Sequence, residues 1–106
     1  MELRHLRYFV AVVEEQSFTK AADKLCIAQP PLSRQIQNLE EELGLQLLER
    51  GSRPVKTTSV GQFFYQYAVK LLSNADQMVS MTKRIASVET TIKIGFVGSL
   101  LFGLLP

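Results

Sequence analysis

Residues 29–44 of the chain, QPPLSRQIQNLEEELG, predict the central helix of the fold. Pro30 and Pro31 fit the first turn of a helix, where backbone N–H groups lack partners within the helix, and they are excluded from its interior. Gly44 is a typical C-terminal stop, because glycine readily adopts the left-handed backbone conformation. Between these ends, apolar residues recur at steps of three and four residues and form one stripe: Leu32, Ile36, Leu39 and Leu43.

Two shorter helices are predicted before residue 29. Residues 3–15 carry apolar side chains at steps of three and four residues, which is typical of an amphipathic helix. Ser17 is a suitable N-cap for a second helix of about two turns that ends near Leu25. Residues 26–28 then lead to the proline-initiated helix, so the second and third helices are joined by a short turn.

Residues 45–58 have a different pattern, which predicts a small hairpin. Two short runs, Leu45–Glu49 and Val55–Thr58, are separated by the sequence RGSRP at residues 50–54. Two helices joined by a short turn and followed by a basic hairpin have the layout of a winged helix-turn-helix. We therefore expect a mainly α fold, with three helices and a two-stranded wing in residues 1–58, followed by a long helix.

This long helix is predicted to run from residue 59 to about residue 89. The segment contains no proline, and its only glycine is Gly61 in the first turn. About 30 residues of helix would be roughly 45 Å long, which exceeds the width of the domain before it. An apolar stripe is usually ordinary core, but over this length a second copy of the chain is the better partner. The linker and dimerisation helix, residues 59–89, contributes this stripe: Phe64, Tyr67, Leu71, Ala75, Met78 and Ile85.

Residues 90–106 follow the long helix. The run Ile92–Val97 is typical of a strand, and the rest is largely apolar up to Pro106. We interpret these residues as the start of a truncated second domain or as a disordered tail.

Composition and charge exclude several classes of protein. The chain has 106 residues, 46% of them hydrophobic and 21% charged, which is typical of one small globular domain and not of a disordered or collagen-like chain. The single cysteine, Cys26, excludes an internal disulfide framework and favours a reducing, cytoplasmic setting. The first residues lack a signal-peptide pattern, and the longest nearly uncharged stretch, residues 94–106, is too short to span a membrane.

No catalytic, metal or cofactor site is predicted. Glu40, Glu41 and Glu42 resemble paired acid-base carboxylates, but they are adjacent at a helix end with no nearby His, Ser or Cys. A solvated helix face is the better interpretation. The glycines at 95, 98 and 103 lack GxGxxG spacing, so no dinucleotide site is predicted and the chain is not expected to be an enzyme.

The positions of the charged residues favour DNA binding, although the net charge of the chain does not. The formal net charge is only +2, and residues 1–58 contain eight Lys or Arg and eight Asp or Glu. Phosphate would repel the acidic end of the third helix, so only its N-terminal end, the positive end of the helix dipole, can approach DNA. There the helix presents groups suited to base edges in the major groove: Gln29, Pro30, Pro31, Ser33 and Arg34.

The hairpin and the second helix add further candidate contacts. Arginines on a hairpin tip suit a narrow, negative minor groove, and an ordinary solvated turn is the alternative. We expect Arg53 to reach the minor groove. Four other residues are expected at or near phosphates: Arg50, Lys56, Thr19 and Lys20.

Several of these segments resemble one protein family. The resemblance is carried by LRYF at residues 6–9, SFTKAA at 17–22, the whole of 29–44, LLER at 47–50 and the stretch from Thr58 to Gly61. Together they resemble the N-terminal DNA-binding domain and linker helix of LysR-type transcriptional regulators.

The resemblance implies a sequence-specific transcription regulator, with tetramers in the full-length protein. Two long helices are expected to pair antiparallel, and because such a homodimer has two-fold symmetry it should bind a pseudo-palindromic operator in double-stranded DNA. It also implies a downstream effector-binding domain of periplasmic-binding-protein type, of which residues 92–106 would be the opening. The chain is most similar to regulators of benzoate and catechol catabolism that respond to aromatic acids or muconate, so such a compound is the implied effector. Read from the residues alone, the alternative is a helical protein-interaction module that dimerises through the long helix without binding DNA.

Overall fold

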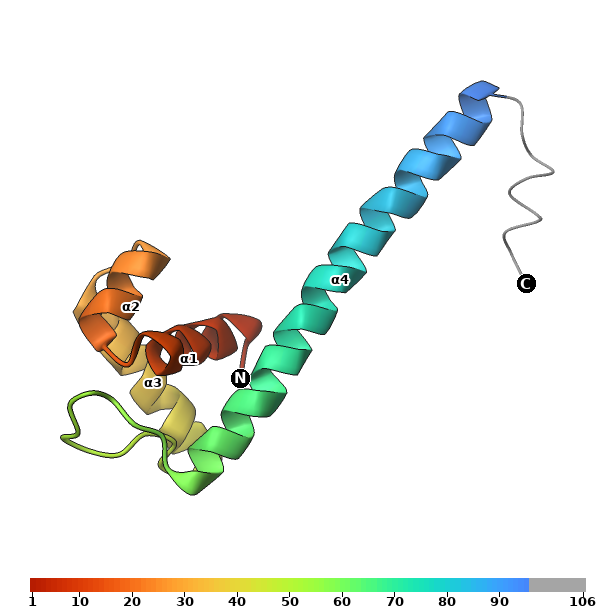
Figure 1. Cartoon of the computed structure of the whole chain (residues 1–106). Coiled ribbons are helices and arrows are strands. Elements are labelled where there is room, and N and C mark those ends of the chain that lie inside the picture. The colour runs from red at the N-terminus through yellow and green to blue at the C-terminus, as the bar shows by residue number, and fades with distance from the viewer. Residues whose placement is uncertain (96–106) are drawn as a thin grey trace. The chain divides into compact units, whose positions relative to one another are not determined.

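The computed structural model of the chain describes residues 1–95, which form four helices (Figure 1). These are α1 (Leu3–Glu15), α2 (Phe18–Leu25), α3 (Gln29–Leu43) and α4 (Ser59–Gly95). The chain divides into two compact units, Met1–Leu72 and Ser73–Pro106. The first three helices lie where the sequence predicts them, and the mainly helical character of the fold is confirmed.

Local capping residues set the ends of the short helices. The Ser17 hydroxyl oxygen accepts a hydrogen bond from the Lys20 backbone N–H at 3.1 Å, so Ser17 caps α2 as predicted. Gly44 ends α3 with φ +69°, and its N–H donates to the Glu41 carbonyl at 3.2 Å. Such a left-handed residue at the helix end is the usual role of glycine.

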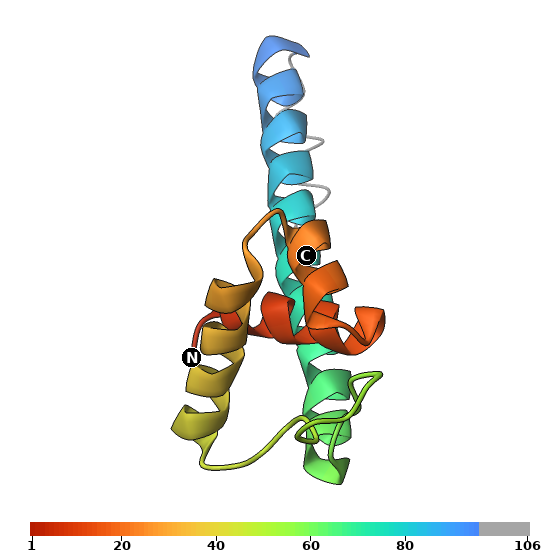
Figure 2. The ribbon, with the colours of Figure 1, turned by 90° about the vertical axis from the view of Figure 1, so that its left-hand side faces the viewer.

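The core of the first unit lies where α1 meets α2, α3 and the first turns of α4. Figures 1 and 2 show how these helices are arranged around α1. Phe9 is fully buried, and its ring meets Phe64 of α4 edge to face, with 5.4 Å between the centroids. The other large, fully buried side chains join α1, α3 and the segment after α3: Leu6, Val12, Leu32, Ile36, Leu39 and Leu47. Leu43, which the sequence pattern places on the core stripe of α3, is exposed.

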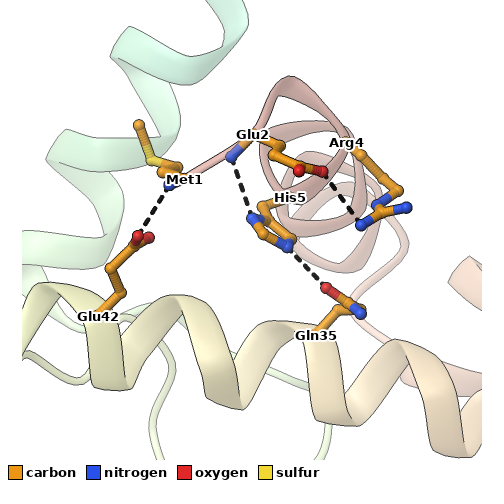
Figure 3. Close-up of polar contacts among 6 residues, drawn as sticks. All are labelled: Met1, Glu2, Arg4, His5, Gln35 and Glu42. Atoms are coloured by element: carbon orange, nitrogen blue, oxygen red, sulfur yellow. Dashed lines mark hydrogen bonds and ion pairs between the residues drawn. The ribbon is translucent and has the colours of Figure 1, made fainter.

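Polar contacts reinforce the packing of α1 (Figure 3). The His5 Nε2 atom lies 2.7 Å from the Gln35 Oε1 atom and joins the start of α1 to α3. The Met1 amino group pairs with Glu42 at 2.8 Å, and this hydrogen bond lowers the pKa of the Glu42 carboxyl. At the other end of α1, the Tyr65 hydroxyl donates to Glu14 at 2.9 Å. Burial, followed by that bond, raises the pKa of Tyr65.

The segment from residue 45 to residue 58, which we call the wing, is paired more briefly than predicted. Within the described residues it contains an isolated antiparallel bridge between Leu48 and Thr57, next to a backbone hydrogen bond from Glu49 N–H to the Lys56 carbonyl at 2.9 Å. The two predicted runs therefore lie side by side but do not form longer strands.

Helix α4 begins against the wing and is longer than predicted. Thr58 caps it, because its hydroxyl oxygen accepts the Gly61 N–H at 3.0 Å. The helix continues through residues 92–95, so the predicted strand at residues 92–97 is wrong for those four residues. Phe96 and Val97 lie outside the described residues, as does the remainder of the segment 90–106 after residue 95. Among the described helices, none is both long enough and apolar enough to cross a membrane.

Candidate nucleic-acid interface

The start of α3 exposes one side and buries the other. Leu32 and Ile36 are buried, which turns the opposite side of the first two turns outward. Pro30, Pro31 and Arg34 are exposed on this helix, whereas Gln29 and Ser33 are half-buried. The side-chain amide of Gln29 donates to the Ser33 hydroxyl oxygen at 2.8 Å, so these two residues hold each other in place.

A hollow of about 540 Å³ brings α2, α3 and the wing together. Thr19 and Lys20 contribute to it from the first turn of α2, Gln29 from the start of α3, and Arg53 from the wing. The wing is held here by a backbone hydrogen bond from Val55 N–H to the Gln16 carbonyl at 3.0 Å. Four residues predicted separately as DNA contacts therefore line one concave surface.

A second hollow, of about 710 Å³, lies between α3 and the base of the wing. Ser33 and Gln37 line it from the helix, and Arg50 lines it from the wing. Arg34, Lys56 and the two prolines line neither hollow, so the structure does not bring them into these two groups.

The five cations that the sequence predicts as DNA contacts are available for an anionic partner. Within residues 1–95, none of the following side chains forms an ion pair with a carboxylate: Lys20, Arg34, Arg50, Arg53 and Lys56. All five residues are exposed. Unpaired, solvated cations can bind phosphate without first breaking an internal salt bridge.

Glu40 is a residue of this region that sequence reasoning missed. One of its carboxylate oxygens accepts backbone N–H groups from both Leu47, at 2.7 Å, and Leu48, at 3.1 Å. Glu40 is half-buried, so the predicted solvated face is wrong for this residue. Glu41 and Glu42 are exposed as predicted, and Glu42 also pairs with the Met1 amino group. No local signal reveals this role, because the partners lie beyond the turn that follows α3.

The predicted dimerisation residues divide into two kinds. Phe64 is half-buried against Phe9 in the core of its own chain, and Ala75 is partly exposed. In the first unit Tyr67 is 57% exposed and Leu71 47%; in the second unit Met78 is 64% exposed and Ile85 58%. Four of the six predicted residues are therefore free to contact a partner.

Residues 3–62 match the bacterial regulatory helix-turn-helix proteins of the lysR family. The chain belongs to the LysR family. It is 92% identical over 106 residues to the HTH-type transcriptional regulator BenM of Acinetobacter baylyi, and it spans 35% of that protein's length. It is 52% identical over 107 residues to the probable cat1 operon transcriptional activator of Acinetobacter lwoffii, again spanning 35% of the relative.

Solved structures of LysR-family proteins agree with the fold. A BenM DNA-binding domain in complex with catB site 1 DNA matches 82% of this chain and 98% of that chain, with TM-score 0.81 and 93% identity. The DNA-binding domain of CbnR in a DNA complex matches 81% of this chain and 99% of that chain, with TM-score 0.76 and 40% identity. The predicted winged helix-turn-helix fold is thereby confirmed, as is the predicted family.

Proposed function

We propose that this chain is the DNA-binding part of a dimeric LysR-family transcription regulator that reads its operator with the start of α3. The observation that carries the proposal is the two-sided packing of α3. Leu32 and Ile36 are buried in the core, so Pro30 and Arg34 are presented outward at the positive end of the helix. Double-stranded DNA is the partner that suits this end of the helix and the unpaired cations around it.

We assign base reading to α3 and backbone or minor-groove contacts to the wing and α2. Gln29, Pro30, Ser33 and Arg34 would enter the major groove. Arg53 would enter the minor groove, because a slender basic loop fits that narrow, negative space. Residues at or near phosphates would be Thr19, Lys20, Arg50 and Lys56.

The proposed dimer pairs two copies of α4 antiparallel through its exposed apolar side chains. Tyr67, Leu71, Met78 and Ile85 carry this proposal, and Phe63, which is 64% exposed, extends the same stripe at a four-residue step. An antiparallel pair has two-fold symmetry, so the operator would be pseudo-palindromic with half-sites about one helical turn, or a multiple, apart.

We also propose that the complete regulator acts in the cytoplasm on genes of aromatic-compound catabolism, as an activator. An aromatic acid or muconate would bind a domain outside residues 1–89, and the full-length protein would be a tetramer. The high identity to BenM and the likeness to a cat1 operon activator support this assignment. Residues 1–58 would then be the DNA-binding domain and 59–89 the linker helix. Residues 90–106, of which 90–95 still belong to α4, would be the start of the effector-binding domain or a tail.

Selection of binding sites from random duplexes, followed by titration at several salt concentrations, tests the proposal. A LysR-family reader should select one pseudo-palindrome and bind it with a steep salt dependence. A helical interaction module would select no sequence, and absence of binding even at low salt would contradict DNA recognition by this chain.

The first prediction concerns Arg34. Replacing it with alanine should weaken binding to the selected site by about 1–3 kcal/mol and weaken binding to random DNA much less. The reason is that a bidentate contact to a base edge exists only at the right sequence. Anisotropy titrations on both duplexes measure the difference. The control is Lys24→Ala, which removes an exposed cation at the end of α2 that pairs with Glu15. Equal losses of affinity on both duplexes would show that Arg34 contacts phosphate instead of a base.

The second prediction concerns Arg53. The wild-type chain should bind a site with A·T-rich flanks more tightly than one with G·C-rich flanks, since A-tracts narrow the minor groove and strengthen its negative potential. Arg53→Ala should remove most of that preference and leave half-site discrimination in place. If flank composition has no effect on wild-type affinity, the wing does not read the minor groove.

A further inference from the structure

Glu40 forms the side-chain link between α3 and the base of the wing. Its Oε2 atom accepts the N–H groups of Leu47 at 2.7 Å and Leu48 at 3.1 Å. The neighbouring Glu41 is exposed and has no such bond within the described residues. Two backbone donors that converge on one half-buried carboxylate make a strong, charge-assisted contact.

Leu47 and Leu48 are one of two attachment points of the wing, the other being the Val55 N–H bond to the Gln16 carbonyl at 3.0 Å. Leu48 bridges Thr57 on the returning side of the wing, and the Leu47 carbonyl accepts the Thr58 N–H at 3.0 Å. Thr58 in turn donates its hydroxyl to the Gln46 carbonyl at 2.7 Å and caps α4 at Gly61. A shift of Leu47 and Leu48 would therefore move both sides of the wing and the start of α4.

We propose that Glu40 is a positioning residue that fixes the wing, and with it Arg53, relative to α3. The carboxylate touches no DNA in this proposal. It sets the separation between the side chains that enter the major groove and the arginine that enters the minor groove. The part of this inference that concerns DNA rests on the proposed function, whereas the part that concerns the wing does not.

The negative charge of Glu40 and its proposed positioning role predict opposite effects of Glu40→Ala on DNA binding, which makes the proposal testable. Removing a negative charge near DNA strengthens binding by a simple electrostatic argument. If Glu40 positions the wing, its removal instead weakens binding. Glu41→Ala is the matched control, because Glu41 is adjacent and exposed and carries the same charge.

The first measurement uses the free chain. Amide hydrogen exchange by NMR should show the Leu47 and Leu48 N–H groups of Glu40→Ala exchanging about tenfold faster or more, while Glu41→Ala leaves them unchanged. Glu40→Gln keeps an uncharged oxygen acceptor and should give intermediate exchange. If Glu40→Ala does not fold, as judged by circular dichroism, the Glu40→Gln variant is used for both measurements. Unchanged exchange in the folded variant would overturn the proposal.

The second measurement uses duplexes that carry the selected half-sites with A·T-rich or G·C-rich flanks. Glu40→Ala should bind the A·T-flanked site about threefold to tenfold more weakly than wild type and lose the flank preference, but keep its discrimination against a scrambled half-site. Binding equal to that of Glu41→Ala on every duplex would overturn the positioning role. If the wild-type chain itself shows no preference for any sequence, the proposed function fails, while the exchange data still decide whether Glu40 holds the wing.

Discussion

Replacing Gly61 with alanine is expected to destabilise the fold of residues 1–72 strongly. A Cβ atom at this position would lie 1.8 Å from the Leu47 carbonyl oxygen and 2.7 Å from its carbonyl carbon. Both atoms belong to backbone that is fixed by the buried Leu47 side chain and by the Thr58 N–H, so neither can rotate away. We expect a loss of more than about 3 kcal/mol in the free energy of unfolding, because relief requires α4 to separate from the wing.

Gly44→Ala is the matched control for this substitution. Gly44 has φ +69° and no atom within 4 Å of an added Cβ, so alanine meets only backbone strain there. Such strain costs about 1 kcal/mol. Urea unfolding followed by circular dichroism compares the two variants. A Gly61→Ala chain as stable as Gly44→Ala would mean that α4 does not approach Leu47 closely.

The helices of the first unit follow from local signals in the sequence. Ser17 accepts the Lys20 N–H, Gly44 adopts the left-handed conformation, and the prolines occupy the first turn of α3. Each of these effects involves residues a few positions apart, so the sequence alone is sufficient to predict it. The same holds for the exposure of Arg34, which follows from the burial of Leu32 and Ile36 on the opposite side of the helix.

The packing of α4 could not be predicted in the same way. Its first turns are apolar on several sides, so periodicity cannot tell which stripe faces α1. The structure buries Ala68 and Leu72 beside Leu6, whereas the predicted stripe through Tyr67 and Leu71 is exposed. Which side packs is decided by α1, which lies far away in the sequence.

Contacts across long sequence separations also explain the other differences. The wing pairs at Leu48 and Thr57 but forms no longer ladder, because its two sides are held by groups outside it, including Gln16 and Glu40. Strand propensity does not contain that information. The sequence alone does not distinguish Glu40 from the two acidic residues that follow it. Its contacts with the Leu47 and Leu48 N–H groups appear only in the structure.

Charge on the exposed stripe of α4 is expected to abolish dimers, which makes Leu71→Glu the second substitution with a large predicted effect. Leu71 is 47% exposed in the single chain, and Tyr67 beside it is 57% exposed, so neither is needed for the core of its own unit. Burying each such side chain between two copies stabilises the dimer by roughly 1.5–3 kcal/mol. A carboxylate at position 71 would instead be desolvated without a partner in both copies, which opposes association.

The consequence for DNA follows from the two-fold arrangement. A dimer places two copies of α3 on one operator, so the second half-site is bound at a high effective concentration. A monomer loses that gain, and we expect operator affinity to fall about 100-fold or more while each first unit stays folded. Gln66→Glu adds the same charge at an exposed polar position of α4 and should leave dimerisation and operator affinity unchanged.

Sedimentation equilibrium measures dimerisation, and operator titration measures affinity. The proposal that α4 is the dimer interface is wrong if the wild-type chain remains monomeric at high micromolar concentration. It is also wrong if the Leu71→Glu chain still forms dimers.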